Sequence, residues 1–375
     1  MSRNRVLYNV SALYASESIG SQASGKHVQL KRVQSFGSST EIVRQDVLQL
    51  GQLSRLDSVV VSPPNVTADL KYLLSDGANE LGLGFYIQSP SSTGEASFPS
   101  GHLATSSGYN LYEVIGSEGI DLNYESSLSG KVVRGYGNAF LSNYSVEAAV
   151  GGFPTVTVSF EASNTNAGTY VYTPNATGIN TPAIDPVAGI PLTQNTGVTL
   201  PTPTTGSGPT CLRPGDLSIS FGNLTSTSST KASSFHALTG VDGLRVQNIS
   251  LSIPLSREPI EQLGSRFPFA RPVKFPVTAT LTVSALANEI VSRNLASMLD
   301  DSSENDINIT INQPGGAAGM LYSFRGARFD SEKSSLDLSS NKTVDLSFST
   351  QIGGISANTS RGIYVSGSYS GTVFS

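Results

Sequence analysis

The feature that most constrains the fold is a gap-free repeat within the chain. Residues Val33 to Gly51 align with residues Val246 to Gly264, at an offset of 213 positions. The identical residues are Val33, Gln34, Ser39, Arg44, Gln49, Leu50 and Gly51, which recur as Val246, Gln247, Ser252, Arg257, Gln262, Leu263 and Gly264. The same offset relates Val60 to Val273, Pro63 to Pro276, Thr67 to Thr280 and Leu73 to Leu286. Such self-similarity indicates that one structural unit occurs twice.

A second pair of similar blocks follows in the same order. Thr155–Phe160 resembles Thr343–Phe348, and Gly137–Phe140 resembles Gly326–Phe329. The distance from Gly51 to Phe160 is 109 residues but that from Gly264 to Phe348 is 84, so the first copy has about 25 more residues in its middle. Two blocks in one order favour a tandem duplication over two unrelated β segments that share common residue types.

The repeat predicts two domains with a connecting segment. The first domain covers residues 1–165 and the second covers residues 213–375. Residues 166–212 between them are rich in Ser, Thr, Pro and Gly, a composition typical of a linker or an extended arm. Roughly 50 extended residues at about 3.1–3.6 Å each are long enough to cross a neighbouring subunit.

Both copies have the pattern of an all-β protein. Charged residues make up only 14% of the chain, which disfavours a helical bundle, while 15 Phe and 14 Tyr disfavour disorder. Period-2 alternation or β-branched enrichment predicts strands at Ser58–Ser62, Val66–Leu74, Thr155–Phe160, Leu217–Phe221, Val246–Leu255, Val277–Val283 and Ile307–Ile311. An apolar stripe predicts a helix over Ala287–Leu299. We therefore expect two tandem β-barrel or β-sandwich domains, each with one short flanking helix.

Residues suited to catalysis or metal binding are sparse. His27, His102 and His236 lack metal-ligand spacing, and their Gly/Ser-rich surroundings predict surface or loop positions. The acidic run Asp300–Asp306 lacks the central Gly and final Glu of an EF-hand, and the single Cys211 excludes an intramolecular disulfide. We predict no catalytic residues, no cofactor and no metal, and hence a protein that is not an enzyme.

The repeated motif is the most specific candidate site. It comprises Arg44, Gln49, Leu50 and Gly51 in the first copy and Arg257, Gln262, Leu263 and Gly264 in the second. One interpretation is a strand that ends in a fixed arginine contact and a Gly-supported turn. The other places each arginine at a subunit contact, where its planar guanidinium holds a carboxylate or carbonyl group of a neighbour. The sequence leaves both open.

The segment Ser256–Val277, with the looser version from Val43 to Pro64, resembles the tail tube proteins of tailed bacteriophages. The first copy departs from the second by Asp46 in place of Pro259. The resemblance covers two stretches of about 35 residues. It implies a β-barrel or β-sandwich fold, stacked rings whose strands line a lumen, and, for a duplicated chain, trimeric rings in preference to hexamers.

The resemblance implies a virion structural protein that forms the conduit for DNA ejection. The net charge of −5 and the pI near 5.3 disfavour tight phosphate binding, so we expect DNA to pass without being held. Expected partners are further copies of the chain and other tail proteins, such as a sheath, terminator or baseplate. We expect synthesis in the host cytoplasm without secretion, no membrane contact, and a place in the virion. A neck, terminator or decoration protein and a carbohydrate-binding β-sandwich are the alternatives.

Overall fold

The fold was described from a computed structural model of the 375-residue chain. The described residues are 11–17, 27–89, 96–104, 108–116, 121–124, 128, 131–169, 200–203, 212–221, 244–263, 268, 270–287, 304–312, 318–335, 343–353 and 361–367. Their antiparallel strands make up one large sheet system and one separate hairpin. The predicted all-β fold is confirmed.

The strands form two sets, one in each half of the chain. The first set is β1 (Ser11–Glu17), β2 (His27–Leu30), β3 (Val33–Glu41), β6 (Asn65–Leu73), β7 (Tyr109–Ile115), β8 (Val132–Ala149), β9 (Thr155–Ala162) and β10 (Asn164–Thr169). The second is β11 (Leu217–Phe221), β12 (Leu244–Pro254), β13 (Val277–Ala287), β14 (Asn305–Asn312), β15 (Ala318–Ser335), β16 (Thr343–Ile352) and β17 (Gly362–Gly367). The predicted strands match these elements, but Val66–Leu74 and Val246–Leu255 each run one residue past the end of β6 and β12. Ser58–Ser62 begins in the separate hairpin and continues two residues beyond it.

Each set is organised around one long strand. β8 and β15 are both 18 residues long, which allows each to take part in two sheets. The first part of β8 pairs with β7 and β10, and its last part pairs with β9. β15 pairs in the same way with β14 and β17, then with β16. The result is two packed sheets per set, joined by a strand common to both.

The two sets also share their pairing register. Leu141 lies opposite Phe160 and Phe329 lies opposite Phe348, each followed by a register shift on the long strand. The pair Val66–Ala162 has its counterpart in Ala279–Thr350. β10 pairs with β8 along the same stretch in which β17 pairs with β15. In the same way, β1 pairs with β7 where β11 pairs with β14. Among the described strands the two sets therefore match one to one except for β2, which has no counterpart in the second set, whereas common ancestry and the domain limits stay predictions.

A local backbone feature recurs as well. Asn138 in β8 has φ 50° and Gly326 at the equivalent place in β15 has φ 60°. The N–H of Asn138 donates to Asn110 Oδ1 at 3.1 Å, and the N–H of Gly326 donates to Asp306 Oδ1 at 3.1 Å. Asn and Gly are the residues that adopt this left-handed conformation most readily, so both long strands bend at this position.

The helices differ from the prediction. In the described residues of the first half there are two short helices, α1 (Ala78–Gly82) and α2 (Ser100–Ala104), instead of one. Five residues are too few to show a 3.6-residue period, which is why the sequence pattern missed them. Of the predicted helix Ala287–Leu299, Ala287 ends β13 and the rest lies outside the described residues.

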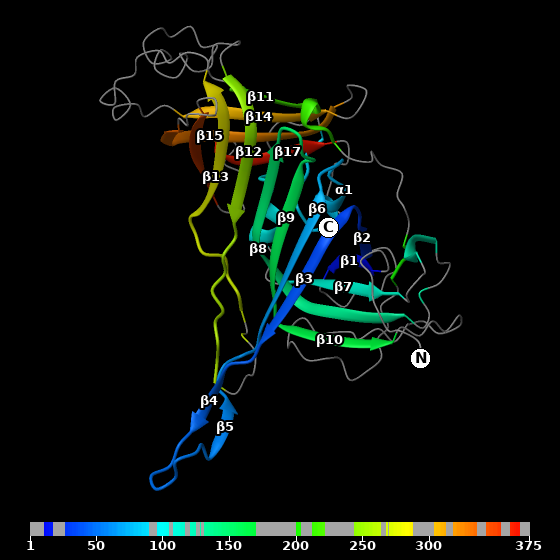
Figure 1. Cartoon of the computed structure of the whole chain (residues 1–375), viewed down its shortest axis with the longest axis vertical. Coiled ribbons are helices and arrows are strands. Elements are labelled where there is room, and N and C mark those ends of the chain that lie inside the picture. The colour runs from blue at the N-terminus through cyan, green and yellow to red at the C-terminus, as the bar shows by residue number, and fades with distance from the viewer. Residues whose placement is uncertain are drawn as a thin grey trace.

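The long sheet runs in the order β3–β6–β9–β8–β12–β13–β16–β15. Along β6, β9 and β16, buried and more exposed residues alternate, so one face of this sheet forms the core. The core includes Leu70, Phe160, Leu281 and Phe348. Its continuity across both sets means that the halves pack as neighbours in one sheet (Figure 1).

The separate hairpin consists of β4 (Arg44–Val47) and β5 (Asp57–Val60). It continues from β3 and β6 and projects well beyond the sheets (Figure 1). Its apolar side chains are exposed, including Leu48, Leu50, Leu53, Leu56 and Val61. An exposed apolar surface of this kind is typical of a site that contacts another protein.

Candidate assembly interface

The two halves meet edge to edge through β8 and β12. These strands pair antiparallel from Asn143 opposite Pro254 to Ala149 opposite Asn248. Beyond the ladder, the N–H of Leu255 donates to the carbonyl of Ser142 at 2.9 Å. This junction shows how the last part of a long strand such as β8 pairs with a strand of another unit, here β12.

Arg257 reinforces the junction. Its guanidinium donates to the carbonyl of Arg271 at 2.7 Å and to the carbonyl of His102 in the first half. It also lies 4.6 Å from the ring centroid of Phe140, a cation–π contact. Burial lowers the pKa of Arg257 to about 10, as expected for a cation removed from water. The loop that follows β12 is therefore fixed against the first half.

The equivalent Arg44 has no such surroundings. The loop after β12 contains the bridges Arg257–Val273 and Ile260–Ala270, in the same register as Arg44–Val60 and Val47–Asp57 in the hairpin. Arg44 is nevertheless exposed, because its hairpin projects from the sheets. Both predicted arginines thus lie in equivalent pairings, but only Arg257 contacts another half. An interface role for Arg44 stays a prediction.

The rest of the repeated motif forms the tips of the two loops. Leu50 is 100% exposed and Leu263 is 104% exposed. Gly51 has φ 89°, a conformation that favours glycine in a turn, and the carbonyl of Gln49 accepts a hydrogen bond from the N–H of Gln52 at 3.2 Å. Gln262 is exposed, whereas Gly264 lies outside the described residues. The tip of the first loop therefore has a turn stabilised by Gly51 and by a backbone hydrogen bond. Among the described residues, neither Leu50 nor Leu263 packs against the rest of the chain.

Part of the extra length of the first half contacts the second half. Residues 74–108 separate β6 from β7, whereas residues 288–304 separate β13 from β14, so the first set has 18 more residues at this place. Gln88 exchanges backbone hydrogen bonds with β17, by donating to the carbonyl of Val365 and accepting from the N–H of Gly367. Phe98 donates from its N–H to the carbonyl of Ile363. These residues act as a strap across the junction, which the sequence did not reveal.

A buried polar cluster lies beneath the strap. Glu80 Oε1 accepts hydrogen bonds from Tyr72 Oη at 2.9 Å and from Tyr144 Oη at 3.4 Å. Tyr144 Oη is also 3.0 Å from Tyr322 Oη, which belongs to the second half. Burial raises the pKa of Glu80 to about 7, and the charge of Asp76 adds to the effect. The chain of hydroxyl groups links a titratable carboxyl group to both halves.

The predicted surface positions of two histidines are wrong. His27 lies in β2 and is 8% exposed, while His102 lies in α2 and is 1% exposed. Burial lowers the pKa of His27 to about 4, and burial together with Arg257 lowers that of His102 to about 3. A neutral imidazole can pack as an aromatic ring, here against Tyr112 and Phe85 respectively. His236 lies outside the described residues.

Both ends of the long sheet are open. In the part of the chain that the structure describes, β3 pairs only with β6, and residues 328–335 of β15 pair only with β16. Their outer backbone groups have no strand partner there. Ser39, Glu41 and Lys333 on these edges are exposed. β3 is equivalent to β12 and β15 is equivalent to β8, so the open edges match the two edges that the internal junction joins.

The solvent-facing side of the long sheet is polar. Small hydroxyl residues predominate along its central strands, as at Ser145, Thr157, Ser159, Ser250, Ser252, Thr280, Thr282 and Ser347. Among the described side chains, the ionisable residues on this side include the acids Glu41, Asp69, Glu147, Glu161 and Asp345 and the bases Lys71, Arg328 and Lys333. The described part of this surface is therefore weakly acidic and shows no basic stripe that would bind phosphates.

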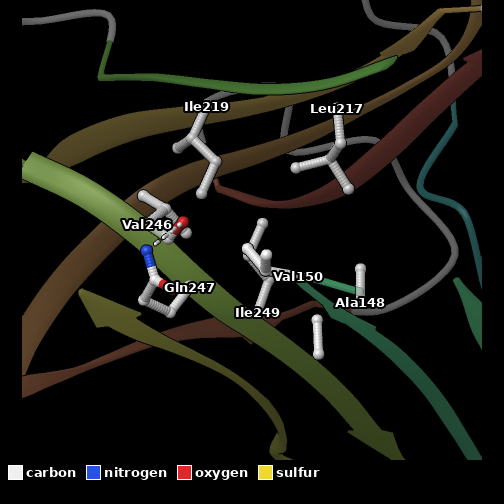
Figure 2. A pocket seen from close by; sticks show the side chains of 8 residues that line it. Ala148, Val150, Leu217, Ile219, Val246, Gln247 and Ile249 are labelled. Carbon is white, nitrogen blue, oxygen red and sulfur yellow. Dashed lines mark hydrogen bonds between the residues drawn. The ribbon is translucent and has the colours of Figure 1, made fainter. Parts of the chain in front are cut away.

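A cavity of about 290 Å³ lies where β8, β11 and β12 meet. Its lining is mainly aliphatic, with Ala148, Val150, Leu217, Ile219, Val246 and Ile249 (Figure 2). The polar side chain of Gln247 donates to the carbonyl of Val246 at 3.5 Å instead of pointing a free group into the cavity (Figure 2). None of these lining residues is titratable, so the cavity offers no acid–base chemistry.

Within the described ranges, no group of three or more His, Cys, Asp or Glu residues could hold a metal ion. No helix in this part of the chain is long and apolar enough to cross a membrane.

Comparisons with known proteins add little. No family model matches the sequence, and no curated protein matches it. A chain in the cryo-EM structure of the anti-feeding prophage baseplate, 6-fold symmetrised, is similar over 33% of this chain and 79% of that chain, with 12% identity and a TM-score of 0.24.

Proposed function

We propose that the chain is a bacteriophage structural protein, a tail tube subunit that assembles with copies of itself into stacked rings. The observation that carries the proposal is the match between the internal junction and the two open edges. The chain contains one joined β8–β12 pair and exposes one equivalent β3 edge and one equivalent β15 edge. A second copy of the chain can satisfy these edges in the way that the chain satisfies its own.

When each contact between β3 and β15 of neighbouring copies repeats the geometry of the β8–β12 junction, a closed ring is favoured. A head-to-tail interface forms a ring when its rotation closes, and it leaves no unpaired edges. Each subunit contributes two equivalent sets of strands, so a trimer has six quasi-equivalent units around its axis. We therefore favour a trimer over a hexamer.

The polar side of the long sheet fits the wall of a DNA channel. In a closed ring this side faces a common axis, with its Ser and Thr hydroxyl groups and its excess of acidic residues. Weakly acidic walls repel phosphate groups, so DNA passes without specific binding. The projecting hairpin provides an apolar surface for contacts with further tail proteins, such as a sheath, a terminator or a baseplate. The proposed location is the virion.

The test is direct observation of assembly. The purified protein is analysed by mass photometry over a range of concentrations and by negative-stain electron microscopy. We expect rings with an axial hole and stacks of them, with a ring mass equal to three subunits. A protein that stays monomeric at every concentration would overturn the proposal. Rings that never stack would favour a neck or terminator protein, which occurs as a single ring.

A further inference from the structure

We infer that β3 of one copy pairs antiparallel with β15 of the next copy in one defined register, with Ser39 opposite Lys333 and Glu41 opposite Ser331. The inference rests on the proposed self-assembly, but the register itself follows from the pairing within the chain. It identifies the partner surface residue by residue.

The register is obtained by transferring the internal junction to the equivalent strands. In that junction, Ser252 of β12 lies opposite Ser145 of β8, and Pro254 lies opposite Asn143. Positions in β3 and β12 differ by 213, and positions in the last parts of β8 and β15 differ by 188. Ser252 therefore corresponds to Ser39 and Ser145 to Lys333. By the same offsets, Pro254 corresponds to Glu41 and Asn143 to Ser331.

The transferred positions are accessible on both edges. Ser39 and Glu41 pair on their inner side with Thr67 and Asn65 of β6. Lys333 pairs on its inner side with Asp345 of β16. The outer sides are open in the described part of the chain, and Ser39, Glu41, Ser331 and Lys333 are all exposed. No side chain has to leave a buried position before the two edges can meet.

Side-chain chemistry supports this register. Glu41 lies diagonal to Lys333 on the same face of the paired strands, at a distance that long side chains can bridge. Asp69 on β6 and Asp345 on β16 are the other nearby acids on that face, and Lys71 is the other nearby base. On the opposite face, Ser38 meets Ser334 and Thr40 meets Glu332, and all four residues are exposed. The faces of the two strands are already fixed by their pairing with β6 and β16, so a slip of one residue would bring together side chains that point to opposite faces, which disfavours it.

Cysteine cross-linking tests the register. The variant Cys211→Ser removes the native thiol and serves as background. Ser39→Cys with Lys333→Cys places two thiols directly opposite each other across subunits, and Glu41→Cys with Ser331→Cys is a second predicted pair. The matched control, Ser39→Cys with Ser331→Cys, uses the same strands and face but a diagonal pair.

Directly opposite residues have Cβ atoms about 4.5–5.5 Å apart and diagonal pairs about 7–8 Å, beyond the range of an unstrained disulfide. After mild oxidation of assembled protein, we expect both predicted pairs to form covalent oligomers up to the ring size. Their yield should exceed that of the control by at least about fivefold, because a disulfide without strain requires Cβ atoms about 3.5–4.5 Å apart. Single-cysteine variants should give dimers at most.

The outcomes separate this inference from the proposed function. If the background protein assembles but the control pair cross-links as well as the predicted pairs, the register is wrong while self-assembly stands. If it assembles and no pair cross-links, β3 and β15 are not the contact edges. If it never assembles, both the inference and the proposed function fail.

Discussion

The junction inside the chain and the two open edges use equivalent strands, yet they are supported very differently. β8 and β12 are joined by a ladder, by Arg257, by the strap around Gln88 and Phe98, and by the Glu80 cluster. β3 and the end of β15 offer only a ladder and a few polar side chains. Backbone pairing alone is weak in water, whereas burial and satisfied hydrogen bonds stabilise a contact permanently.

This difference separates folding from assembly. The supported junction keeps two halves together in every molecule, so the chain behaves as one folded unit. The bare edges form contacts only when several copies are present, and such contacts depend on concentration. The extra residues of the first half thus support the β8–β12 junction, which is present in every molecule. The edges of β3 and β15 lack such support, so their contacts depend on the association of copies.

The largest expected difference in unfolding free energy is between replacements of the two equivalent arginines, Arg257 and Arg44. Arg257→Ala removes hydrogen bonds from a charged donor to two carbonyl groups and a contact with Phe140, so we expect unfolding to become easier by about 3 to 4 kcal/mol. The matched Arg44→Ala change should alter the monomer by less than about 0.5 kcal/mol, because Arg44 is exposed. Urea unfolding of monomeric protein measures both. Equal effects would show that the two loops are equally supported.

The Glu80 cluster predicts a pH-dependent contribution to the junction. The pKa of Glu80 is about 7 in the folded protein and 4.5 in the reference state, so its stabilising effect is complete below pH 4.5 and is lost as the pH rises through 7. The loss amounts to about 3 kcal/mol, since one pKa unit corresponds to about 1.4 kcal/mol.

His27 and His102 act in the opposite direction, because their lowered pKa values favour the fold at higher pH. The measurement is therefore the difference in unfolding free energy between wild type and Glu80→Gln at pH 5 and pH 8. That difference should fall by about 2 to 3 kcal/mol between the two pH values, and the histidines cancel in it. A difference independent of pH would show that Glu80 is not proton-linked to folding.

A smaller effect should come from charges on the open edge. Ser39→Lys places a second cation opposite Lys333 of the next copy, and Ser39→Glu places an acid there. A cross-strand pair contributes roughly 0.2–1 kcal/mol, so the two variants should differ by about 1 kcal/mol, or fivefold in affinity, at each contact. Sedimentation velocity at several concentrations measures the difference. Identical association of the two variants would contradict the register without bearing on the internal junction.

The smallest effect on monomer stability should come from the exposed loop tips. Leu50→Ser and Leu263→Ser change side chains that are fully exposed, so each should alter the unfolding free energy by less than about 0.5 kcal/mol. Thermal unfolding of dilute monomer is sufficient to measure it. A loss above 1 kcal/mol from either change would mean that the tip packs against the chain's own surface.

Local pattern was enough to predict most of the strands. Alternation along Thr155–Phe160 and Val277–Val283 identifies both the strands and their buried faces, because the side-chain period of a strand is short-range. Repeat offsets such as Val33 to Val246 also placed equivalent strands in equivalent positions. The buried histidines escaped prediction because burial depends on neighbours distant in sequence, such as Arg257 beside His102.

Local residue pattern was therefore sufficient for an all-β chain with two similar halves and a repeated Arg-to-Gly motif. The pairing of β12 with β8, the half-buried position of Arg257 in contrast to the exposed Arg44, and the open edges of β3 and β15 depended on the packing of the whole chain. The reason is physical. Similar local sequences form the same strand and turn, but the partner across a strand edge is chosen by long-range packing, and in the described part of the chain only one of two equivalent edges has its partner within the chain.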